Sequence, residues 1–444
     1  MNRPLLLKLL AIIVLTLLIL IPLGLIRDTV QDRQQHRQEA VASIAASYAG
    51  GQTITGPVLV VPYKIKIDEV AQDAEGKKTY HSRSEDRQYL FFPKDLQMRG
   101  ELLPGERYRG LHKVHVYELQ SSFNGRIEYQ LPPAAQLAAD QITLLHPYLA
   151  IRISDVRGLL GSPLLKVGSQ ALPLEQGAGI LGKGMHAGLP QPALPESGSL
   201  EVSVAMTVAG TESLAITPVG YNNRFELSSS WPHPQFGGSF LPRTRDVTEQ
   251  GFRALWEVSS LASNAQRQLR GEDIRADLHT LESIDIQLAE PVNIYSQADR
   301  ATKYGLLFVL LTFVGFFIFE MIKQLPIHPI QYLLVGLGLA IFFLMLVSLS
   351  EHIAFWMAYL AASVACIGLL SFYLSQVLRS AARGLGFGAM LTLLYGTLYG
   401  LLIAEDNALM LGSLMLFVIL AIIMIVTRKI DWYQTSALKI AQGS

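Results

Sequence analysis

The stretch KYGLLFVLLTFVGFFIFEMI, residues 303–322, opens an apolar block that continues to residue 427 and decides the fold. Polar residues interrupt the block at Lys323–Pro329, Ser350–His352, Arg379–Gly384 and Ala404–Asn407. The pieces between them are 303–322, 330–349, 353–375, 385–403 and 408–427. Each is close to the roughly 20 apolar residues that a helix needs to cross a bilayer. Because backbone groups in lipid must be satisfied within the segment, each piece is predicted to be a spanning helix.

The N-terminus carries a further apolar run, from Leu9 to Ile26, behind Arg3 and Lys8. The run is longer than the apolar region of a cleavable signal peptide, and no small-residue cleavage site follows it. Residues 1–26 are therefore predicted to form an uncleaved signal-anchor helix, which makes six spans in all.

Basic residues beside the spans predict the orientation, because Lys and Arg accumulate on the cytoplasmic side. If the spans alternate in direction, the side of the N-terminus receives Lys323, His328, Arg379, Arg383, Arg428 and Lys429. The short loops of the opposite side contain acidic residues and no Lys or Arg. Both termini are thus predicted to be cytoplasmic, with residues 27–302 in the periplasm and 428–444 as a cytoplasmic tail.

Composition and cysteine content argue against a nucleic-acid-binding protein and against a disulfide-stabilised external domain. Half of the 444 residues are hydrophobic, 16% are charged and the formal net charge is zero, so nothing indicates a nucleic-acid partner. The single cysteine, Cys366, lies in the apolar block, so residues 27–302 cannot form disulfides and must rest on an ordinary core.

The external segment begins with a predicted helix over 27–50, which Gly50 and Gly51 end. Short β-like runs follow, and FRALWEVSS (252–260) alternates so that Phe252, Ala254, Trp256 and Val258 share one face. The alternation of HKVHVYELQ (112–120) is imperfect.

Two further stretches are predicted to lack regular structure. The charged residues 68–87 read as a mobile loop, and the Gly- and Pro-rich residues 161–199 as a long irregular connection. The predicted fold class is mixed: an α-helical polytopic membrane bundle of six spans plus a large, mostly-β extracytoplasmic domain of sandwich-like character. The domains are 1–26, 27–302, 303–427 and 428–444.

Two short external loops are expected to bring together the titratable side chains of Glu351, His352, Glu405 and Asp406. Such residues near a membrane often mark ion pathways, so one hypothesis is a cation or proton site at the mouth of the bundle. The favoured alternative is that short external loops simply need polar tips. Glu320 is expected to snorkel to the cytoplasmic interface and pair with Lys323.

The sharpest external motif is WPHPQF (231–236), in which two prolines fix the backbone around His233. One interpretation is a recognition surface; the favoured one is a structural corner whose Trp231 and Phe236 fill the β core. In ISDVRG (153–158), Asp155 and Arg157 are predicted to pair or brace a turn rather than perform chemistry.

Glycines at 384, 388, 396 and 400 form two G-x-x-x-G patterns that allow close helix packing inside the bundle, or a homo-oligomer contact. No nucleophile elbow, phosphate-binding loop or zinc-ligand spacing occurs in the sequence. No catalytic residue, cofactor or metal is therefore predicted, and an enzyme is disfavoured.

Taken together, several stretches resemble the CreD family of inner membrane proteins, also called cell-envelope integrity proteins. SSSWPHPQFGGSFLP (228–242) is similar to the family's S-x-W-P-H-P-x-F-x-G-x-F-L-P signature. The other stretches are TGPVLVVP (55–62), RYRGLHKVHVY (107–117), ISDVRGLLG (153–161), KYGLLF (303–308), AEDNALMLGSLMLF (404–417) and TRKIDWY (427–433). The resemblance implies a bacterial inner-membrane protein linked to envelope-stress responses and to tolerance of envelope-directed toxins and antibiotics, and it supplies no catalytic mechanism.

Two function classes follow. The first is a non-enzymatic envelope protein that acts through its periplasmic domain, with the lipid bilayer and periplasmic or inner-membrane proteins as partners. The second is a transporter or lipid-handling protein that uses the C-terminal bundle.

Overall fold

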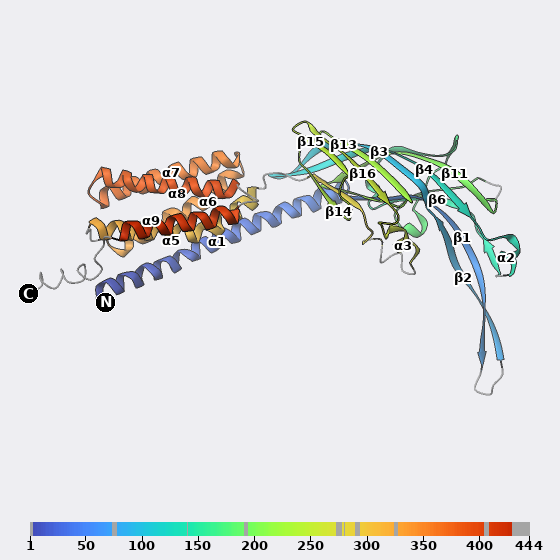
Figure 1. The fold of residues 1–444 in the computed structure, drawn as a ribbon, viewed down its shortest axis with the longest axis horizontal. Helices are drawn as coiled ribbons and strands as arrows, with labels where there is room; N and C mark the ends of the chain where they lie inside the picture. Colours follow the sequence, from blue (N-terminus) through green and yellow to red (C-terminus); the bar gives the residue numbers. More distant parts are fainter. Residues whose placement is uncertain are drawn as a thin grey trace, which may run out of the picture. The chain divides into compact units, whose positions relative to one another are not determined.

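The computed structural model describes residues 3–72, 78–139, 141–190, 194–271, 278, 280–288, 294–323, 327–403 and 408–428. The chain divides into two compact units (Figure 1). The helical unit comprises Met1–Arg37 and Val292–Ser444, and the β unit comprises Gln38–Pro291.

Helix α1 (Arg3–Ser47) is continuous over 45 residues and contributes to both units. The sequence predicts an anchor over 1–26 and a second helix over 27–50, and the structure joins the two into one. The charged residues after Ile26 keep the helical backbone because Gln, Arg, Glu and Ala are good helix formers.

The other helices of the helical unit coincide with the predicted apolar pieces. They are α5 (Ile294–Lys323), α6 (Pro329–Ser350), α7 (Phe355–Val377), α8 (Ala381–Ile403) and α9 (Ala408–Thr427). Among the described residues, α1 and α5 to α8 are long and apolar enough to cross a membrane. The described apolar part of α9, Met410–Ala421, is shorter than these. Among the described residues, five helices are therefore long and apolar enough to cross a membrane, rather than the predicted six. These apolar helices belong to a lipid bilayer.

Close packing of α7 on α8 explains half of the glycine pattern. A Cβ atom on Gly384 would lie 2.7 Å from Ser375 Cβ and 2.9 Å from the carbonyl oxygen of Ser371, and one on Gly388 would overlap the Ser371 hydroxyl. Gly396 and Gly400 instead face open space. The first pair thus packs inside the bundle, and a contact between copies through the second pair stays a prediction.

Replacing Gly384 with alanine is expected to destabilise the helical unit by about 1–3 kcal/mol, because the added methyl group must push α7 away. Gly386→Ala is the matched control, since its Cβ would meet nothing. The thermal unfolding midpoint of the full chain in detergent measures both. Equal midpoints for the two variants would contradict the close packing.

Glu320 differs from its prediction. It is 7% exposed and accepts a hydrogen bond of 2.8 Å from the Tyr332 hydroxyl of α6 and one of 3.3 Å from the Ile327 backbone N–H. The Glu320 carboxyl is therefore buried inside the bundle, where a tyrosine and a backbone donor satisfy it, rather than turned to the interface; its pairing with Lys323 stays a prediction.

The β unit is built from two sheets. One has the order β14-β17-β12-β1-β6-β10-β9, with β2 and β5 also paired to β1, and the other has the order β15-β16-β13-β3-β4-β11-β7-β8. The strands are β1 (Gln52–Gln72), β2 (Lys78–Phe91), β3 (Pro93–Arg109), β4 (His112–Gln130), β5 (Ile142–Leu144), β6 (Tyr148–Ile153), β7 (Leu159–Val167), β8 (Gln170–Leu172), β9 (Glu175–Gln176), β10 (Gly184–Gly188), β11 (Ser197–Thr211), β12 (Ser213–Thr217), β13 (Asn222–Ser229), β14 (Pro234–Gly238), β15 (Thr244–Thr248), β16 (Gly251–Ser259) and β17 (Ile284–Leu288). Short helices α2 (Ala134–Ala139), α3 (Ala265–Arg270), η1 (Val156–Gly158) and η2 (Gly179–Leu181) connect some of them.

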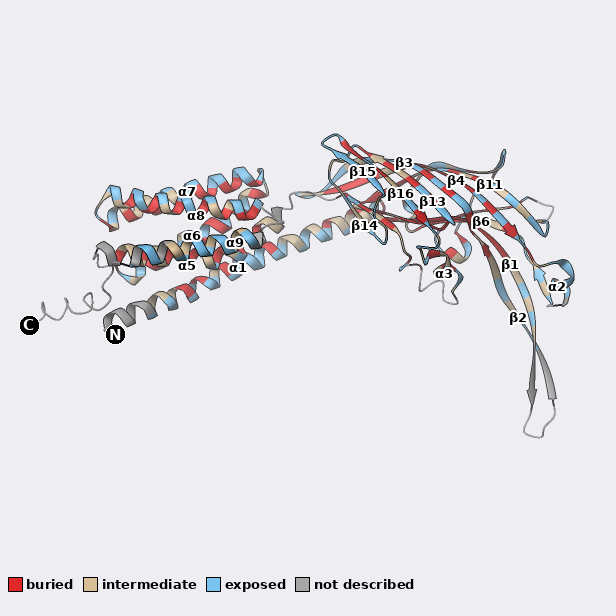
Figure 2. Cartoon of the chain, in the orientation of Figure 1, coloured by how far each residue is buried: buried red, intermediate tan, exposed pale blue. Residues whose placement is uncertain are grey.

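One hydrophobic core joins the two sheets, and its buried residues alternate along the strands (Figure 2). In β16, Phe252, Ala254, Trp256 and Val258 are buried, as the period-two pattern predicts. The mostly-β, sandwich-like prediction is confirmed.

Both segments predicted to be irregular contain strands instead. Over 68–87, β1 and β2 continue as an antiparallel pair up to Gln72 opposite Lys78. Residues 82–84, 86 and 87 are exposed, so their polar side chains fit a hairpin that meets solvent. Residues 73–77 of the predicted loop lie outside the described residues. Over 161–199 the structure has β7 to β10 and the start of β11, separated by turns at glycines such as Gly168 and Gly182 with positive φ.

Candidate functional site: a polar clamp at the end of α1

Asp155 and Arg157 lie in a turn of the S-D-V-R-G motif. Asp155 caps the 3-10 helix η1 by accepting a hydrogen bond of 3.2 Å from the Arg157 backbone N–H. The Arg157 side chain returns to the same carboxylate, with Nη2–Oδ2 at 2.5 Å and Nε–Oδ1 at 2.9 Å. The two residues thus pair and brace a turn, as the sequence predicts.

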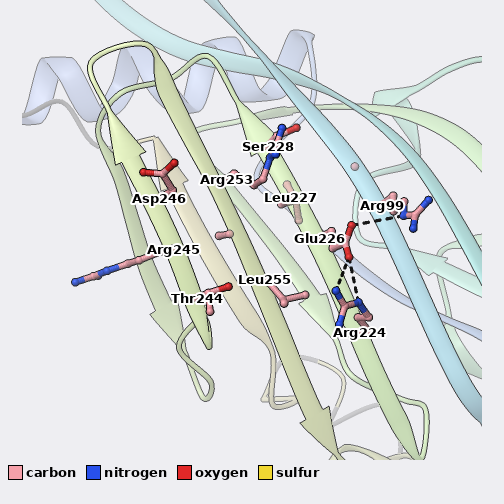
Figure 3. Close-up of a pocket in the computed structure, with 12 residues that line it drawn as sticks. Arg99, Arg224, Glu226, Leu227, Ser228, Thr244, Arg245, Asp246, Arg253 and Leu255 are labelled. Atoms are coloured by element: carbon pink, nitrogen blue, oxygen red, sulfur yellow. Dashed lines mark hydrogen bonds and ion pairs between the residues drawn. The ribbon is translucent and has the colours of Figure 1, made fainter.

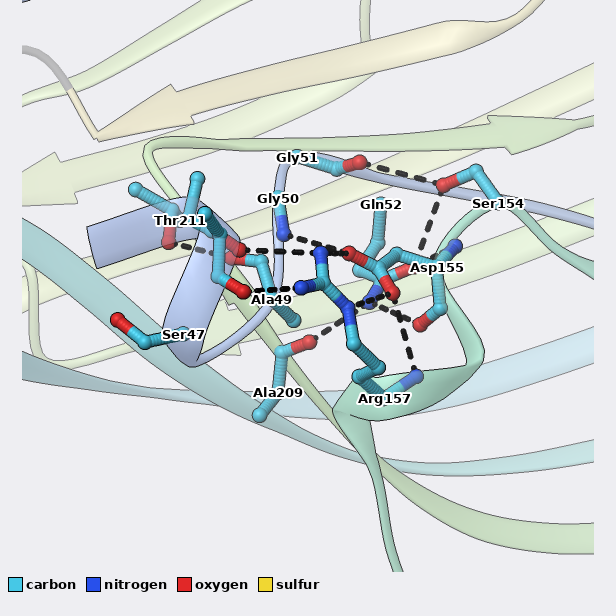
Figure 4. A network of polar contacts seen from close by, with 12 residues as sticks. Ser47, Ala49, Gly50, Gly51, Gln52, Ser154, Asp155, Arg157, Ala209 and Thr211 are labelled. Atoms are coloured by element: carbon cyan, nitrogen blue, oxygen red, sulfur yellow. Dashed lines mark hydrogen bonds and ion pairs between the residues drawn. The ribbon is translucent and has the colours of Figure 1, made fainter. Parts of the chain in front are cut away.

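The same pair holds the C-terminal end of α1 (Figure 4). Arg157 donates to the carbonyl oxygens of Ala45, at 3.2 Å, and of Ala46, while Asp155 accepts from the Gly50 backbone N–H at 3.1 Å. The last carbonyls of a helix have no partner within it, and a positive charge is favourable there. Arg157 therefore supplies both a donor and a compensating charge.

Three further side chains complete this site. The Gln52 amide donates to the carbonyls of Asp155 and Ala209, both at 2.9 Å, and its oxygen accepts from the Ser154 hydroxyl at 3.2 Å. The Thr211 hydroxyl donates to the carbonyl of Ala49 at 2.6 Å. We call this set the α1 clamp: Gln52, Ser154, Asp155, Arg157 and Thr211. It ties the helix end to β1, η1 and β11.

The Arg157 guanidinium, together with the backbone N–H groups of Gly50 and Arg157, holds the pKa of the Asp155 carboxyl well below its ordinary value of 3.8. A lowered folded-state pKa stabilises the fold above the unfolded-state pKa, and the contribution disappears as pH falls toward the folded value. We therefore expect the free energy of unfolding of the β unit to drop as the pH falls below about 4.

Urea unfolding of the full chain at several pH values, with wild type beside Asp155→Asn, measures this contribution. The amide cannot titrate, so its profile should lack the part of the drop that Asp155 causes. Superimposable profiles would contradict the stabilising role of the ionised carboxylate.

The WPHPQF motif packs mainly inward. Trp231 is half-buried, its ring centroid lies 4.5 Å from that of His115, and its indole N–H donates to the His233 carbonyl at 3.0 Å. Phe236 lies edge-on to Phe252 and Trp256, at 5.5 and 5.6 Å. This is the packing of a structural corner. His233 is exposed, and a recognition role for it stays a prediction.

Only part of the predicted membrane-mouth cluster can be placed. Glu351 caps the C-terminus of α6 and pairs with Arg33 of α1 at 3.4 Å, and His352 is exposed in the following turn. Glu405 and Asp406 lie outside the described residues. The sequence does not predict Arg33 as the partner of Glu351, because several other charged residues stand close to Arg33 in α1 and no sequence pattern distinguishes it from them.

The outer face of β3, β13, β15 and β16 carries a hollow of about 550 Å³ that sequence reasoning did not find (Figure 3). Arg224 pairs with Glu226 at 2.8 Å and with Glu257 at 2.6 Å, and Arg99 pairs with Glu226 at 3.5 Å. The pairs of Arg224 with Glu257 and of Arg99 with Glu226 depend on the strand register, which the sequence does not reveal. Among the residues that the structure describes, no three His, Cys, Asp or Glu side chains gather so as to hold a metal ion.

A model of the family described as "Inner membrane protein CreD" matches residues 4–433. Inner membrane protein CreD of Escherichia coli (strain K12) is 35% identical over 441 residues, which cover 98% of this chain and 95% of that protein. Among solved structures, an M1 zinc metallopeptidase from Deinococcus radiodurans is similar over 44% of this chain and 42% of that chain, at 10% identity and a TM-score of 0.21. At that TM-score the likeness carries no argument.

Proposed function

Because the chain belongs to the CreD family of inner membrane proteins, we propose that it supports the integrity of the cell envelope under stress. It acts through its β unit and catalyses no reaction. The observation that supports this proposal most is the α1 clamp. Helix α1 begins in an apolar membrane segment; Arg157 of η1 donates a hydrogen bond to its last turn, and Thr211 of β11 donates one to Ala49 just after it.

The test uses a strain that lacks the gene and the same strain carrying full-length variants at matched abundance. Loss of the gene should increase sensitivity to envelope-directed antibiotics and leakage of a periplasmic marker. Arg157→Ala should restore resistance less than wild type, whereas Arg245→Ala, which changes an exposed arginine of β15, should restore it fully. If the deletion strain under envelope stress showed the same antibiotic sensitivity and the same leakage of the periplasmic marker as wild type, the proposal would be overturned.

In this proposal the β unit is periplasmic and both termini are cytoplasmic. The basic residues that flank the apolar helices support this topology. A cysteine introduced at Leu261, which is 97% exposed, should react with a membrane-impermeant maleimide in cells with a permeabilised outer membrane. The same reagent should not reach a cysteine introduced at Ser444. The reverse pattern would invert the topology.

Protein partners in the envelope would contact the exposed His233 of the WPHPQF motif. A photoreactive residue at this position, in the full chain in intact cells, should capture one reproducible protein adduct. The same group at Arg245 serves as the control. Identical adducts from both positions would show that the WPHPQF motif is not a specific contact for a protein partner.

A groove between α7 and α8 supports a second candidate function, transport or lipid handling. Its volume is about 550 Å³, and its lining includes Trp356, Tyr359, Ser363, Tyr395, Gly396 and Tyr399. The variant Gly396→Leu would fill this groove. The matched control is Gly386→Leu, because Gly386 also faces open space but does not line the groove. If only Gly396→Leu abolishes complementation, the bundle is the working part.

A further inference from the structure

The hairpin of β3 and β4 ends in a tip of mixed apolar and basic character. Tyr108 is 65% exposed and Leu111 is 68% exposed. Scattered exposed hydrophobic residues are normal on any protein. Here two large ones stand within four positions of each other, on one protruding turn.

The turn itself projects these side chains. Arg109 pairs with His112, so only Gly110 and Leu111 form the loop. Gly110 has φ of 59°, the left-handed value that a two-residue hairpin turn requires at its first position and that glycine adopts without strain. A Cβ atom on Gly110 would meet nothing within 4 Å, so the tip is open.

Three basic residues surround the apolar pair. Within Glu106–Lys113 the positive side chains are Arg107, Arg109 and Lys113, and Glu106 carries the single negative charge, so the segment has a formal charge of three minus one, or +2. Glu106 binds Lys113 Nζ at 2.6 Å and accepts from the Tyr108 hydroxyl at 3.1 Å. These contacts hold the Tyr108 ring while leaving it exposed.

The hairpin also packs on the last turns of α1. Val114 and Val116 form a cluster with Ile44, and the Arg107 guanidinium lies 5.4 Å from the centre of the Tyr48 ring. Thr211, opposite Val116, bonds to Ala49. The strands of the hairpin therefore pack beside the last residues of α1 and the residues that follow it.

Basic residues beside an exposed tyrosine and leucine are typical of segments that lie in a membrane interface. The apolar parts enter the headgroup region, and the cations pair with anionic lipid phosphates. We propose that the hairpin tip, residues 106–113, docks on the surface of an anionic phospholipid membrane. This docking is a second membrane contact, separate from the apolar helices and independent of the envelope function proposed above.

The experiment uses the full chain with its one cysteine removed (Cys366→Ala) and an environment-sensitive fluorophore attached at Leu111→Cys. The protein is reconstituted into vesicles of phosphatidylcholine with or without phosphatidylglycerol, doped with a lipid-borne quencher. The same label at Leu261→Cys, another exposed leucine of the β unit, is the matched control.

Quenching at position 111, but not at 261, is expected in the anionic vesicles, and high salt should weaken it. Arg109→Gln should lower the ratio of docked to undocked tips about fivefold, since each basic residue near an anionic surface adds a similar factor. Tyr108→Ser should reduce it as well. Equal quenching at 111 and 261 would overturn the docking, and equal quenching at 111 in neutral and anionic vesicles would overturn the recognition of anionic lipid.

Discussion

Replacing Trp256 with alanine is expected to lower the free energy of unfolding of the β unit by about 3–5 kcal/mol, because it leaves a large cavity between the two sheets. Trp256 is fully buried, contacts the ring of Phe236, and donates its indole N–H to the Phe240 carbonyl at 3.2 Å. The substitution thus removes apolar contacts and also leaves the partly buried Phe240 carbonyl without its donor.

Urea unfolding of the full chain, followed by the β signal in circular dichroism, measures this loss without relying on tryptophan fluorescence. Leu261→Ala is the control, since that side chain is 97% exposed and its truncation should change stability by less than about 0.5 kcal/mol. Trp256→Phe should fall between the two. A loss below about 1 kcal/mol for the alanine variant would mean that the sheets close over the cavity.

Gly158→Ala is expected to destabilise the β unit by about 2–4 kcal/mol, although it adds a single methyl group. A Cβ atom at this position would overlap the Ala209 carbonyl oxygen and the Gln52 amide nitrogen and lie 3.1 Å from Ala49 Cβ. The methyl group would therefore break the hydrogen bonds of Gln52 in the α1 clamp and push away the chain that leaves α1. The final glycine of S-D-V-R-G serves this close approach.

Gly105→Ala is the matched control, because its Cβ would make only an ordinary contact of 3.5 Å with Val116. Proteolysis rates of the full chain near residues 45–52 give a second, local readout. Faster cleavage there for Gly158→Ala alone is expected. If both variants match wild type in stability and cleavage, the clamp does not determine how α1 ends.

The alternation of buried residues could be predicted wherever one strand face meets the core and the other meets solvent, as in β16. In β4 the alternation is imperfect, as the sequence indicates: Val114, His115, Val116 and Tyr117 are all buried. The reason is tertiary: Ile44 of α1 covers Val114 and Val116 on the second face. A local pattern cannot reveal a helix that lies 70 residues earlier in the chain.

The candidate site shows the same limit. The pairing of Asp155 with Arg157 follows from two residues in one turn, and the sequence predicts it. The contacts of Arg157 with Ala45 and Ala46 span more than 100 residues and involve backbone carbonyls, which every residue type carries. No sequence pattern identifies a backbone carbonyl as an acceptor. The contact between this turn and the end of α1 could therefore be found only in the structure.

The strand order also dictates when this protein can mature during its synthesis. Strand β1 pairs in parallel with β12, and β12 pairs with β17, which ends at Leu288, just before α5 begins. The early strands must therefore wait for more than 200 residues of chain before their sheet is complete, and such non-local pairings form slowly and expose sticky edges meanwhile. A chain that ends before residue 284 lacks β17, so β12 and β14 lose their shared antiparallel partner and the sheet stays open at that edge.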